Sequence, residues 1–298
     1  MYKHLVFLGA ILCQSSFAKT ISLPIIFTGE YNMPHIELNL NGTPQLFMLD
    51  TGSRESLHIS QAMMASIPNL ALTGKKQRST DLAGNLFENN QFVIKEISIN
   101  GMIFKDIYGV ELQPWGLSFT FGEKENDKDT DPKPKPEVPV IGLDFFHDHI
   151  VTIDYANKVL IVDDNQDKKV SIKTEGMHKF PFILSEEGVL ISINDGVKDY
   201  VMGIDTGAST TVIRSSVLSP KTAREPCSKM NPEWPSEDCT VIALQMPSLK
   251  LKEPIYAVVL EEDAGNFENA GLLGTNFLER FLVTMDMKNK ALLLKPIE

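Results

Sequence analysis

Positive charge is scarce in this sequence: 28 Lys and Arg residues stand against 39 Asp and Glu residues, which gives a net charge of −11. A surface of that sign repels phosphate groups, so we expect no binding to nucleic acid or to anionic membranes. Long apolar runs are also lacking, and we therefore expect no stable membrane insertion. The charge balance says little about catalysis.

Common catalytic and cofactor motifs are missing as well. The sequence contains no Gly-rich phosphate loop, no dinucleotide-binding fingerprint and no Ser–His nucleophile elbow. His147 and His149 have a spacing that permits shared metal ligation, but no accompanying Cys or carboxylate pattern supports zinc. We therefore predict no cofactor, no metal, and a surface position for both histidines.

The first eighteen residues have the pattern of a signal peptide. Lys3 precedes a short apolar run at 5–12, and small residues stand at the −3 and −1 positions before a cleavage site that follows Ala18. The pattern predicts an exported protein, either periplasmic or secreted, that begins at Lys19. Loss of Lys3 changes the net charge to −12.

Cysteine is rare, with three residues in the whole chain. Cys13 lies in the predicted signal peptide, where the preceding Leu12 is a poor match to a lipid-anchoring signal. Cys227 and Cys239 remain, separated by eleven residues. In an oxidising compartment such a pair predicts one local disulfide, and the alternative is a pair of buried free thiols.

The chain contains an internal repeat. Four blocks recur in the same order, each with a strand-like pattern, and Asp50-Thr51-Gly52 returns 155 residues later as Asp205-Thr206-Gly207. The matched pairs are 36–42 with 189–196, 47–53 with 201–208, 140–146 with 272–278, and 151–154 with 283–286. We interpret this order as the duplication of a whole domain.

The fold class follows from short periodic segments. Most are four to eight residues long, rich in Val, Ile and Phe, and separated by Gly, Asn and Pro, which predicts an all-β chain with a few short helices. One helix is expected at 60–67 and one after each later Gly of the repeat. The expected organisation is a signal peptide (1–18), an N-terminal lobe (19–162), a linker (163–169) and a C-terminal lobe (170–298), with an exposed charged loop that contains proline (123–137).

With both Asp-Thr-Gly blocks in context, the sequence resembles the aspartic peptidases, especially their bacterial retropepsin-like branch. The matching residues are 49–53 with 140–142, and 204–210 with 272–274. The resemblance implies two β-barrel lobes of the retropepsin or pepsin type, with a cleft between them. It also implies that Asp50 and Asp205 form the catalytic pair within one chain, so that the protein is a monomer, an intramolecular pseudo-dimer.

Two carboxylates within hydrogen-bonding distance share one proton, because like charges raise one pKa. The ionised member then draws a proton from a bound water while the protonated member binds the scissile carbonyl, so water is the nucleophile. Glycines are expected to permit a tight backbone. The family resemblance implies that the threonines bond across to the opposite loop. These supporting residues are Thr51, Gly52, Ser53, Thr206, Gly207 and Ala208, with Gly142 and Gly274 behind the loops.

The two copies differ beside the aspartates. Ser53 matches Ala208, and a hydroxyl that donates to a carboxylate favours its charged form, so we expect Asp50 to carry the charge more often than Asp205. Arg54 and Glu55 replace the small residues that the family prefers. The arginine is expected either near the pair or in solvent, paired with Glu55.

A flap over the cleft is expected in the first copy. Its tip and its substrate contacts are assigned to Asp81, Ala83 and Gly84, with a plain surface hairpin as the alternative. The equivalent place in the second copy holds the Cys227–Cys239 loop, so no second mobile flap is expected. Trp234 in that loop either lines the cleft or caps the loop.

The leading hypothesis is an aspartic endopeptidase that cuts extended peptide or protein substrates between apolar residues. The alternative is a catalytically silent peptide-binding protein that keeps the bilobal cleft, with Arg54 and Glu55 as its best support. A third reading, in which each lobe is a half-site in a larger oligomer, is weaker because one chain supplies both aspartates.

Overall fold

A computed structural model describes residues 19–29, 32–80, 86–112, 138–164, 176–185, 188–234, 239–249, 251–260 and 269–297. The predicted signal peptide, the charged loop 123–137 and the flap residues Asp81, Ala83 and Gly84 lie outside these ranges. No helix in the described part of the chain is long and apolar enough to cross a bilayer.

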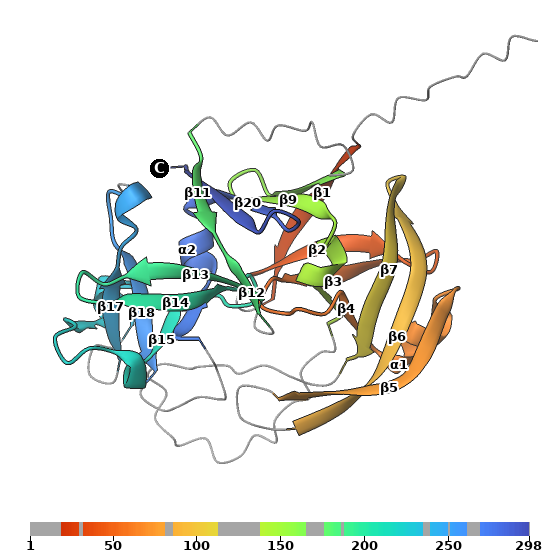
Figure 1. Cartoon of the computed structure of the whole chain (residues 1–298), viewed down its shortest axis with the longest axis horizontal. Coiled ribbons are helices and arrows are strands. Elements are labelled where there is room, and N and C mark those ends of the chain that lie inside the picture. Colours follow the sequence, from red (N-terminus) through yellow and green to blue (C-terminus); the bar gives the residue numbers. More distant parts are fainter. Residues whose placement is uncertain are drawn as a thin grey trace, which may run out of the picture.

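The predicted all-β fold is confirmed, with a matching series of elements in each half of the chain (Figure 1). The first half contains β1 (Thr20–Thr28), β2 (Met33–Asn39), β3 (Pro44–Asp50), β4 (Leu57–Ile59), α1 (Gln61–Ser66), β5 (Leu70–Thr80), β6 (Leu86–Ile99), β7 (Met102–Glu111), β8 (Val140–Gly142), η1 (Leu143–Phe146), β9 (His149–Asp154) and β10 (Val159–Asp164). The second half contains β11 (His178–Pro181), β12 (Ile183–Ser185), β13 (Gly188–Asn194), β14 (Asp199–Ile204), β15 (Val212–Arg214), η2 (Ser215–Val217), β16 (Glu225–Pro226), η3 (Cys227–Lys229), β17 (Thr240–Leu244), η4 (Pro247–Leu249), β18 (Ile255–Leu260), β19 (Gly271–Leu273), α2 (Thr275–Leu278), β20 (Phe281–Asp286) and β21 (Ala291–Pro296).

The same strand pairing occurs in both repeats. Strand β3 runs parallel to β8, and β14 runs parallel to β19, so each aspartate loop lies beside the strand that carries the later glycine. The next strand, β4 or β15, inserts antiparallel to that short strand and parallel to β7 or β18. The repeated sequence blocks therefore correspond to one repeated topology.

The two lobes are joined by a shared sheet, in the order β11-β21-β20-β9-β10-β1 (Figure 1). At its centre β9 pairs with β20, and the hydroxyls of Thr152 and Thr284 are 2.8 Å apart. These threonines occupy equivalent positions of the repeat, so the pseudo-twofold axis passes between them. The predicted linker starts too early, because Asp163 and Asp164 belong to β10 and Asp163 pairs with Thr20.

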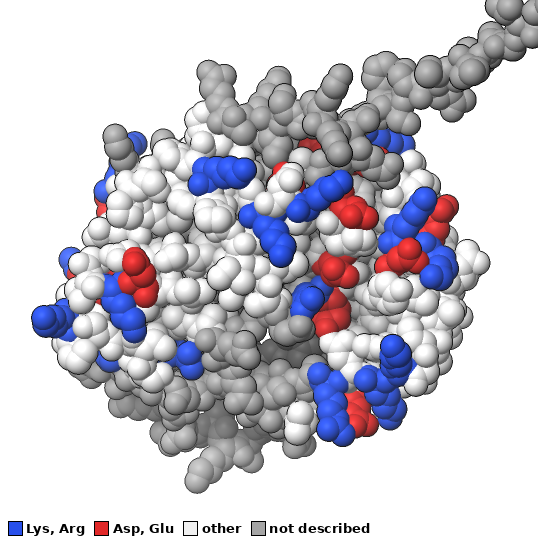
Figure 2. Space-filling model, viewed as in Figure 1, with Lys and Arg blue, Asp and Glu red and all other residues white. Residues whose placement is uncertain are grey.

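Each lobe has a core of aromatic and branched side chains. The largest fully buried aromatics are Phe47, Phe92, Phe104, Phe145 and Phe146 in the first repeat, and Tyr200, Phe277 and Phe281 in the second. On the strands this burial follows the alternation of apolar residues, since successive side chains of a strand point to opposite faces. Phe145, Phe146 and Phe277 come instead from the short helices η1 and α2. On the described part of one face, acidic and basic side chains are intermixed (Figure 2).

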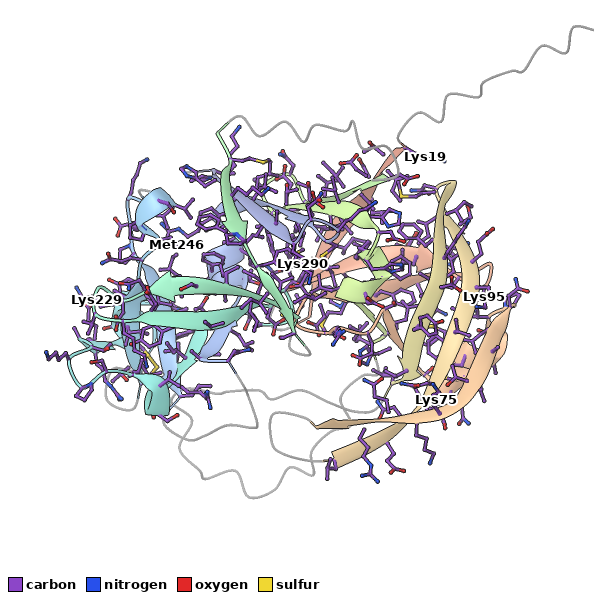
Figure 3. All side chains as sticks on the ribbon, in the orientation of Figure 1. Lys19, Lys75, Lys95, Lys229, Met246 and Lys290 are labelled. Carbon is purple, nitrogen blue, oxygen red and sulfur yellow. A yellow bond between two sulfur atoms is a disulfide. The ribbon has the colours of Figure 1, made fainter. Side chains whose placement is uncertain are left out.

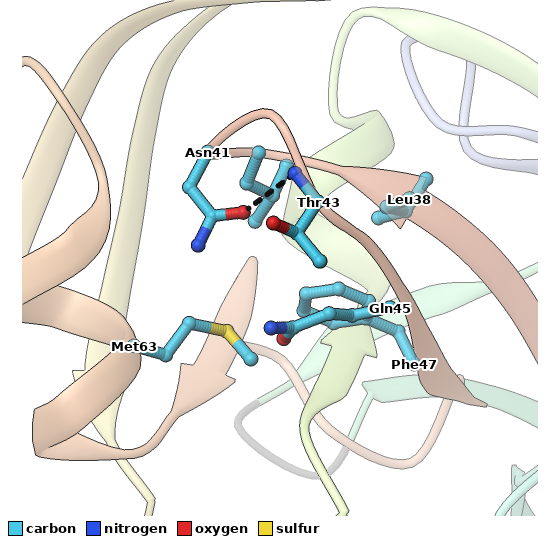
Figure 4. A pocket seen from close by; sticks show the side chains of 7 residues that line it. Leu38, Asn41, Thr43, Gln45, Phe47 and Met63 are labelled. Carbon is cyan, nitrogen blue, oxygen red and sulfur yellow. Dashed lines mark hydrogen bonds between the residues drawn. The ribbon is translucent and has the colours of Figure 1, made fainter.

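The predicted short helices are confirmed. Helix α1 begins after Ser60, whose side chain caps it by accepting a hydrogen bond from the Met63 backbone N–H at 3.3 Å. Its Met63 lies beside Phe47 under the β2–β3 turn, where the Thr43 N–H donates to the Asn41 side chain at 3.1 Å (Figure 4). The helices η1 and α2 directly follow Gly142 and Gly274.

Candidate active site

The two Asp-Thr-Gly loops meet where the lobes join. Asp50 ends β3 and is only 4% exposed, and Asp205 directly follows β14. The two carboxyl groups share a hydrogen bond. Backbone N–H groups hold them from behind: Gly52 donates to Asp50 Oδ1 at 2.9 Å, and Gly207 donates to Asp205 Oδ1 at 2.7 Å. The tertiary structure thus brings together the two aspartates that the repeat singled out.

The threonines of the two loops bond reciprocally. The Thr51 N–H donates to Thr206 Oγ1 at 2.9 Å, and the Thr206 N–H donates to Thr51 Oγ1 at 3.0 Å. Each hydroxyl then donates to a backbone carbonyl of the opposite repeat, that of Ile204 or Leu49, at 3.0 and 2.7 Å. Four buried hydrogen bonds therefore tie each loop to the other and restrict the separation of the carboxylates.

The glycines of these loops are required for space. A Cβ on Gly52 would lie 2.6 Å from Cγ of Asp205, and one on Gly207 would lie 2.8 Å from Cγ of Asp50. Neither residue has a positive φ, so the backbone conformation does not explain why glycine is needed at these positions. Glycine is needed because the opposite carboxylate approaches closely. Behind the first loop, a Cβ on Gly142 would lie 2.1 Å from the Glu55 carbonyl oxygen.

Burial raises the pKa of both carboxyls, because the low-dielectric surroundings disfavour a charge. The pKa of Asp50 rises further, since the charge of Asp205 adds to the effect of burial, although N–H donors from Gly52 and Ser53 oppose it. These effects favour the shared proton on Asp50. This direction is opposite to the expectation that Asp50 carries the charge more often.

Comparison with solved structures places this geometry in a known fold. The chain superposes on a basic 7S globulin from soybean with a TM-score of 0.54 at 12% identity, covering 93% of this chain and 95% of that one. It superposes on an aspartic proteinase from Irpex lacteus with a TM-score of 0.51 at 13% identity, covering 93% and 97%. The chain has the bilobal fold of the pepsin-like aspartic proteinases. No family model and no curated protein sequence matches it.

Within this pepsin-like fold, Ser53 departs from its expected role. Its hydroxyl lies 2.7 Å from Nε2 of His58, and only its backbone N–H reaches Asp50, at 3.2 Å. Glu55 lies beside the same imidazole and accepts a hydrogen bond from Gln77, so its partners are His58 and Gln77. Sequence reasoning missed His58; the signal was a lone polar residue in the short buried strand β4, five residues after Ser53.

The hairpin that carries the predicted flap is long in the first repeat. Strands β5 and β6 pair from Leu70↔Ile94 to Thr80↔Leu86, with a register shift between Leu72 and Lys76. The predicted tip itself falls outside the described residues. In the second repeat the matching strands β16 and β17 pair over only two positions, so the two hairpins are unequal.

The short hairpin of the second repeat contains the predicted disulfide, which is confirmed between Cys227 and Cys239 (Figure 3). Trp234 packs against the small apolar cluster around this bond, together with Val241 and Val258. Trp234 therefore caps the loop, which was one of the two positions expected for it; the other was the lining of the cleft.

The prediction of a surface position is wrong for His149. This side chain is 7% exposed in β9, and its ring lies 4.7 Å from the ring of Phe104. It points inward because its place in the alternation of β9 faces the core. His147 is half-buried, with Nδ1 2.7 Å from the Asp144 carbonyl oxygen. Among the described residues, no group of three or more His, Cys, Asp or Glu side chains is arranged to hold a metal ion.

Proposed function

We propose that the chain is an aspartic endopeptidase that hydrolyses peptide bonds with a water molecule activated between Asp50 and Asp205. The observation that carries the proposal is the pair of carboxyls, the buried Asp50 and the half-buried Asp205, that come from the two repeats and share a hydrogen bond. The reciprocal bonds of Thr51 and Thr206 support it, because they hold both loops in one geometry before a substrate arrives.

The proposed reaction uses the unequal pKa values of the pair. Ionised Asp205 takes a proton from the water as its oxygen attacks the peptide carbonyl carbon, while protonated Asp50 donates its proton to the carbonyl oxygen. The resulting tetrahedral diol collapses as the leaving nitrogen receives the proton held by Asp205 and the C–N bond breaks. A diol hydroxyl returns its proton to Asp50, which restores the singly protonated pair. The expected substrates are extended peptides with apolar residues around the cut.

The test uses the chain from Lys19 onward and a mixed peptide library between pH 3 and 7, with and without pepstatin. Asp50→Asn and Asp205→Asn should each abolish cleavage. Asp106→Asn is the matched control: Asp106 is exposed, pairs with Lys95 at 2.9 Å, and has a φ of 49°, which asparagine tolerates. Activity that survives the loss of Asp205 contradicts an intramolecular pair.

The catalytically silent peptide-binding protein is the second candidate. It is favoured by one observation, since one of the two structural neighbours is named as a globulin and the other as a proteinase. Binding of peptides or pepstatin without cleavage at any pH from 3 to 7 would establish this candidate and reject the first.

We also infer that the protein is exported and monomeric, and that its lobes are of the retropepsin-like type. The Cys227–Cys239 disulfide supports export, because such bonds persist in oxidising compartments. The presence of both aspartates in one chain supports a monomer. Fractionation of the producing cells and light scattering of the purified protein test these two inferences; activity that requires a dimer contradicts the second.

A further inference from the structure

A chain of polar contacts runs from the first aspartate loop to the long hairpin. Ser53 Oγ lies 2.7 Å from His58 Nε2, and the same nitrogen lies 3.7 Å from a carboxylate oxygen of Glu55. The other oxygen of Glu55 accepts a hydrogen bond from Gln77 of β5, and Gln77 in turn accepts one from Gln91 of β6 at 3.0 Å. These contacts are partly buried, and their side chains come from the loop, β4, β5 and β6.

Ser53 connects this series of polar contacts to the catalytic pair. Its N–H donates to Asp50 Oδ1 at 3.2 Å, and its carbonyl accepts a hydrogen bond from the Leu143 N–H at 2.9 Å. Its hydroxyl is the remaining polar group, and that group is in contact with His58. A serine hydroxyl has one proton to donate, so the role taken by His58 decides where that proton goes.

The electrostatics of Glu55 assign that role. Burial raises the pKa of Glu55, but hydrogen bonds and charge from His58, together with the bond from Gln77, outweigh it and lower the pKa to about 2. The ionised carboxylate lies near Nε2, which favours a proton on that nitrogen. His58 therefore donates to Ser53 Oγ and fixes the position of that hydroxyl.

The second repeat forms the same loop without these groups. Its Ala208 N–H donates to the Asp205 carbonyl at 3.3 Å, as that of Ser53 does to the Asp50 carbonyl at 3.2 Å. The Ala208 carbonyl accepts from Thr275 at 2.8 Å, and residues 209–214 contain neither His nor Glu. The loop therefore adopts its conformation without the side-chain contacts of Ser53. The need to form this loop does not by itself explain why Ser53 contacts His58.

We propose that His58 is a positioning residue for the peptidase reaction: it holds the Ser53 hydroxyl, so that the Ser53 backbone N–H stays on Asp50, and it is itself held in place by Glu55. This proposal rests on the proposed function, because it assumes that the Asp50–Asp205 pair hydrolyses peptides. The Ser53–His58–Glu55 contacts are present in the first repeat and absent from the second. Gln77 connects them to the long hairpin.

The experiment is a double-mutant cycle on kcat and KM with a peptide that the wild-type chain cleaves. His58→Phe and Ser53→Ala should each lower kcat about tenfold, with KM changed less than about twofold, because the contact orients reacting groups. The double variant should be no slower than Ser53→Ala, since His58 acts through that hydroxyl. His58→Gln should restore most of kcat, because its side-chain amide supplies an N–H donor at the same reach.

Several outcomes decide the proposal. Additive losses in the cycle, or a His58→Phe variant with wild-type kcat, overturn it. If His58→Phe does not fold, the comparison of Ser53→Ala with His58→Gln still decides, because Ala208 occupies this place in the second repeat. His178→Phe, on the edge strand β11, is the matched control and should leave kcat unchanged. If the wild type cleaves the peptide and the losses in the cycle are additive, only this inference is rejected. If the wild type does not cleave, both the proposed function and this inference are rejected.

Discussion

The reciprocal threonine bonds permit a quantitative test of how the two lobes are held together. Thr206 is 0% exposed, and its hydroxyl accepts from the Thr51 N–H and donates to the Leu49 carbonyl. Thr206→Val replaces that hydroxyl with a methyl group of similar size. The substitution therefore leaves no cavity and removes two hydrogen bonds between the repeats.

The expected cost follows from the two backbone groups that lose their partners. A buried donor or acceptor left without a hydrogen bond costs about 1–3 kcal/mol, so the free energy of unfolding should fall by about 2–6 kcal/mol. Such a loss is large against a total stability of about 5–15 kcal/mol for a typical domain. Because the same bonds restrict the carboxylate separation, kcat should fall as well.

The assay is denaturant unfolding at a fixed pH, with kcat measured on the same preparations. Thr284→Val is the matched control, since it removes one hydroxyl contact with Thr152 on the same pseudo-twofold axis but lies in the shared sheet. It should cost about 1 kcal/mol and leave kcat unchanged. A loss below about 1 kcal/mol for Thr206→Val, with normal kcat, refutes the assignment of these bonds as the tie between the loops.

Three further changes have defined outcomes. Gly142→Ala should lower stability by about 1–3 kcal/mol in denaturant melts, because its Cβ would lie 2.1 Å from a backbone oxygen; an unchanged midpoint contradicts the close approach. The pKa of Glu55 is lowered to about 2 from an ordinary value of 4.5. The contribution of its carboxylate to the free energy of unfolding is therefore complete above pH 4.5 and is lost as the pH falls toward 2. Glu55→Gln should remove about 3 kcal/mol of that pH dependence, measured as unfolding free energy against pH, and an unaltered slope argues against the ionised carboxylate. Reduction of Cys227–Cys239 should cost about 3 kcal/mol and lower Tm, with a double serine variant as control; equal Tm values for the oxidised and reduced chains exclude a stabilising disulfide.

The internal repeat predicted a duplicated domain and singled out the two central residues, and the resemblance to aspartic peptidases supplied the bilobal arrangement. Strand patterns and turn residues act locally, so the all-β class, α1 and the short helices after Gly142 and Gly274 follow from nearby sequence. Duplication adds long-range information, because equivalent positions related by a twofold axis can meet at that axis. Asp50 and Asp205 meet in this way, as do Thr152 and Thr284.

The side-chain environment of the pair depended on the tertiary structure. The partner of the Ser53 hydroxyl is set by the direction in which His58 leaves β4. Asp50 and His58 are both near Ser53 in the sequence, so the sequence alone cannot show which of them the hydroxyl contacts. Which aspartate holds the proton depends on what covers each carboxyl and on the charge beside it. Gly52 is required because a side chain from 153 residues further along the chain packs against it, a contact that exists only once the two lobes have met.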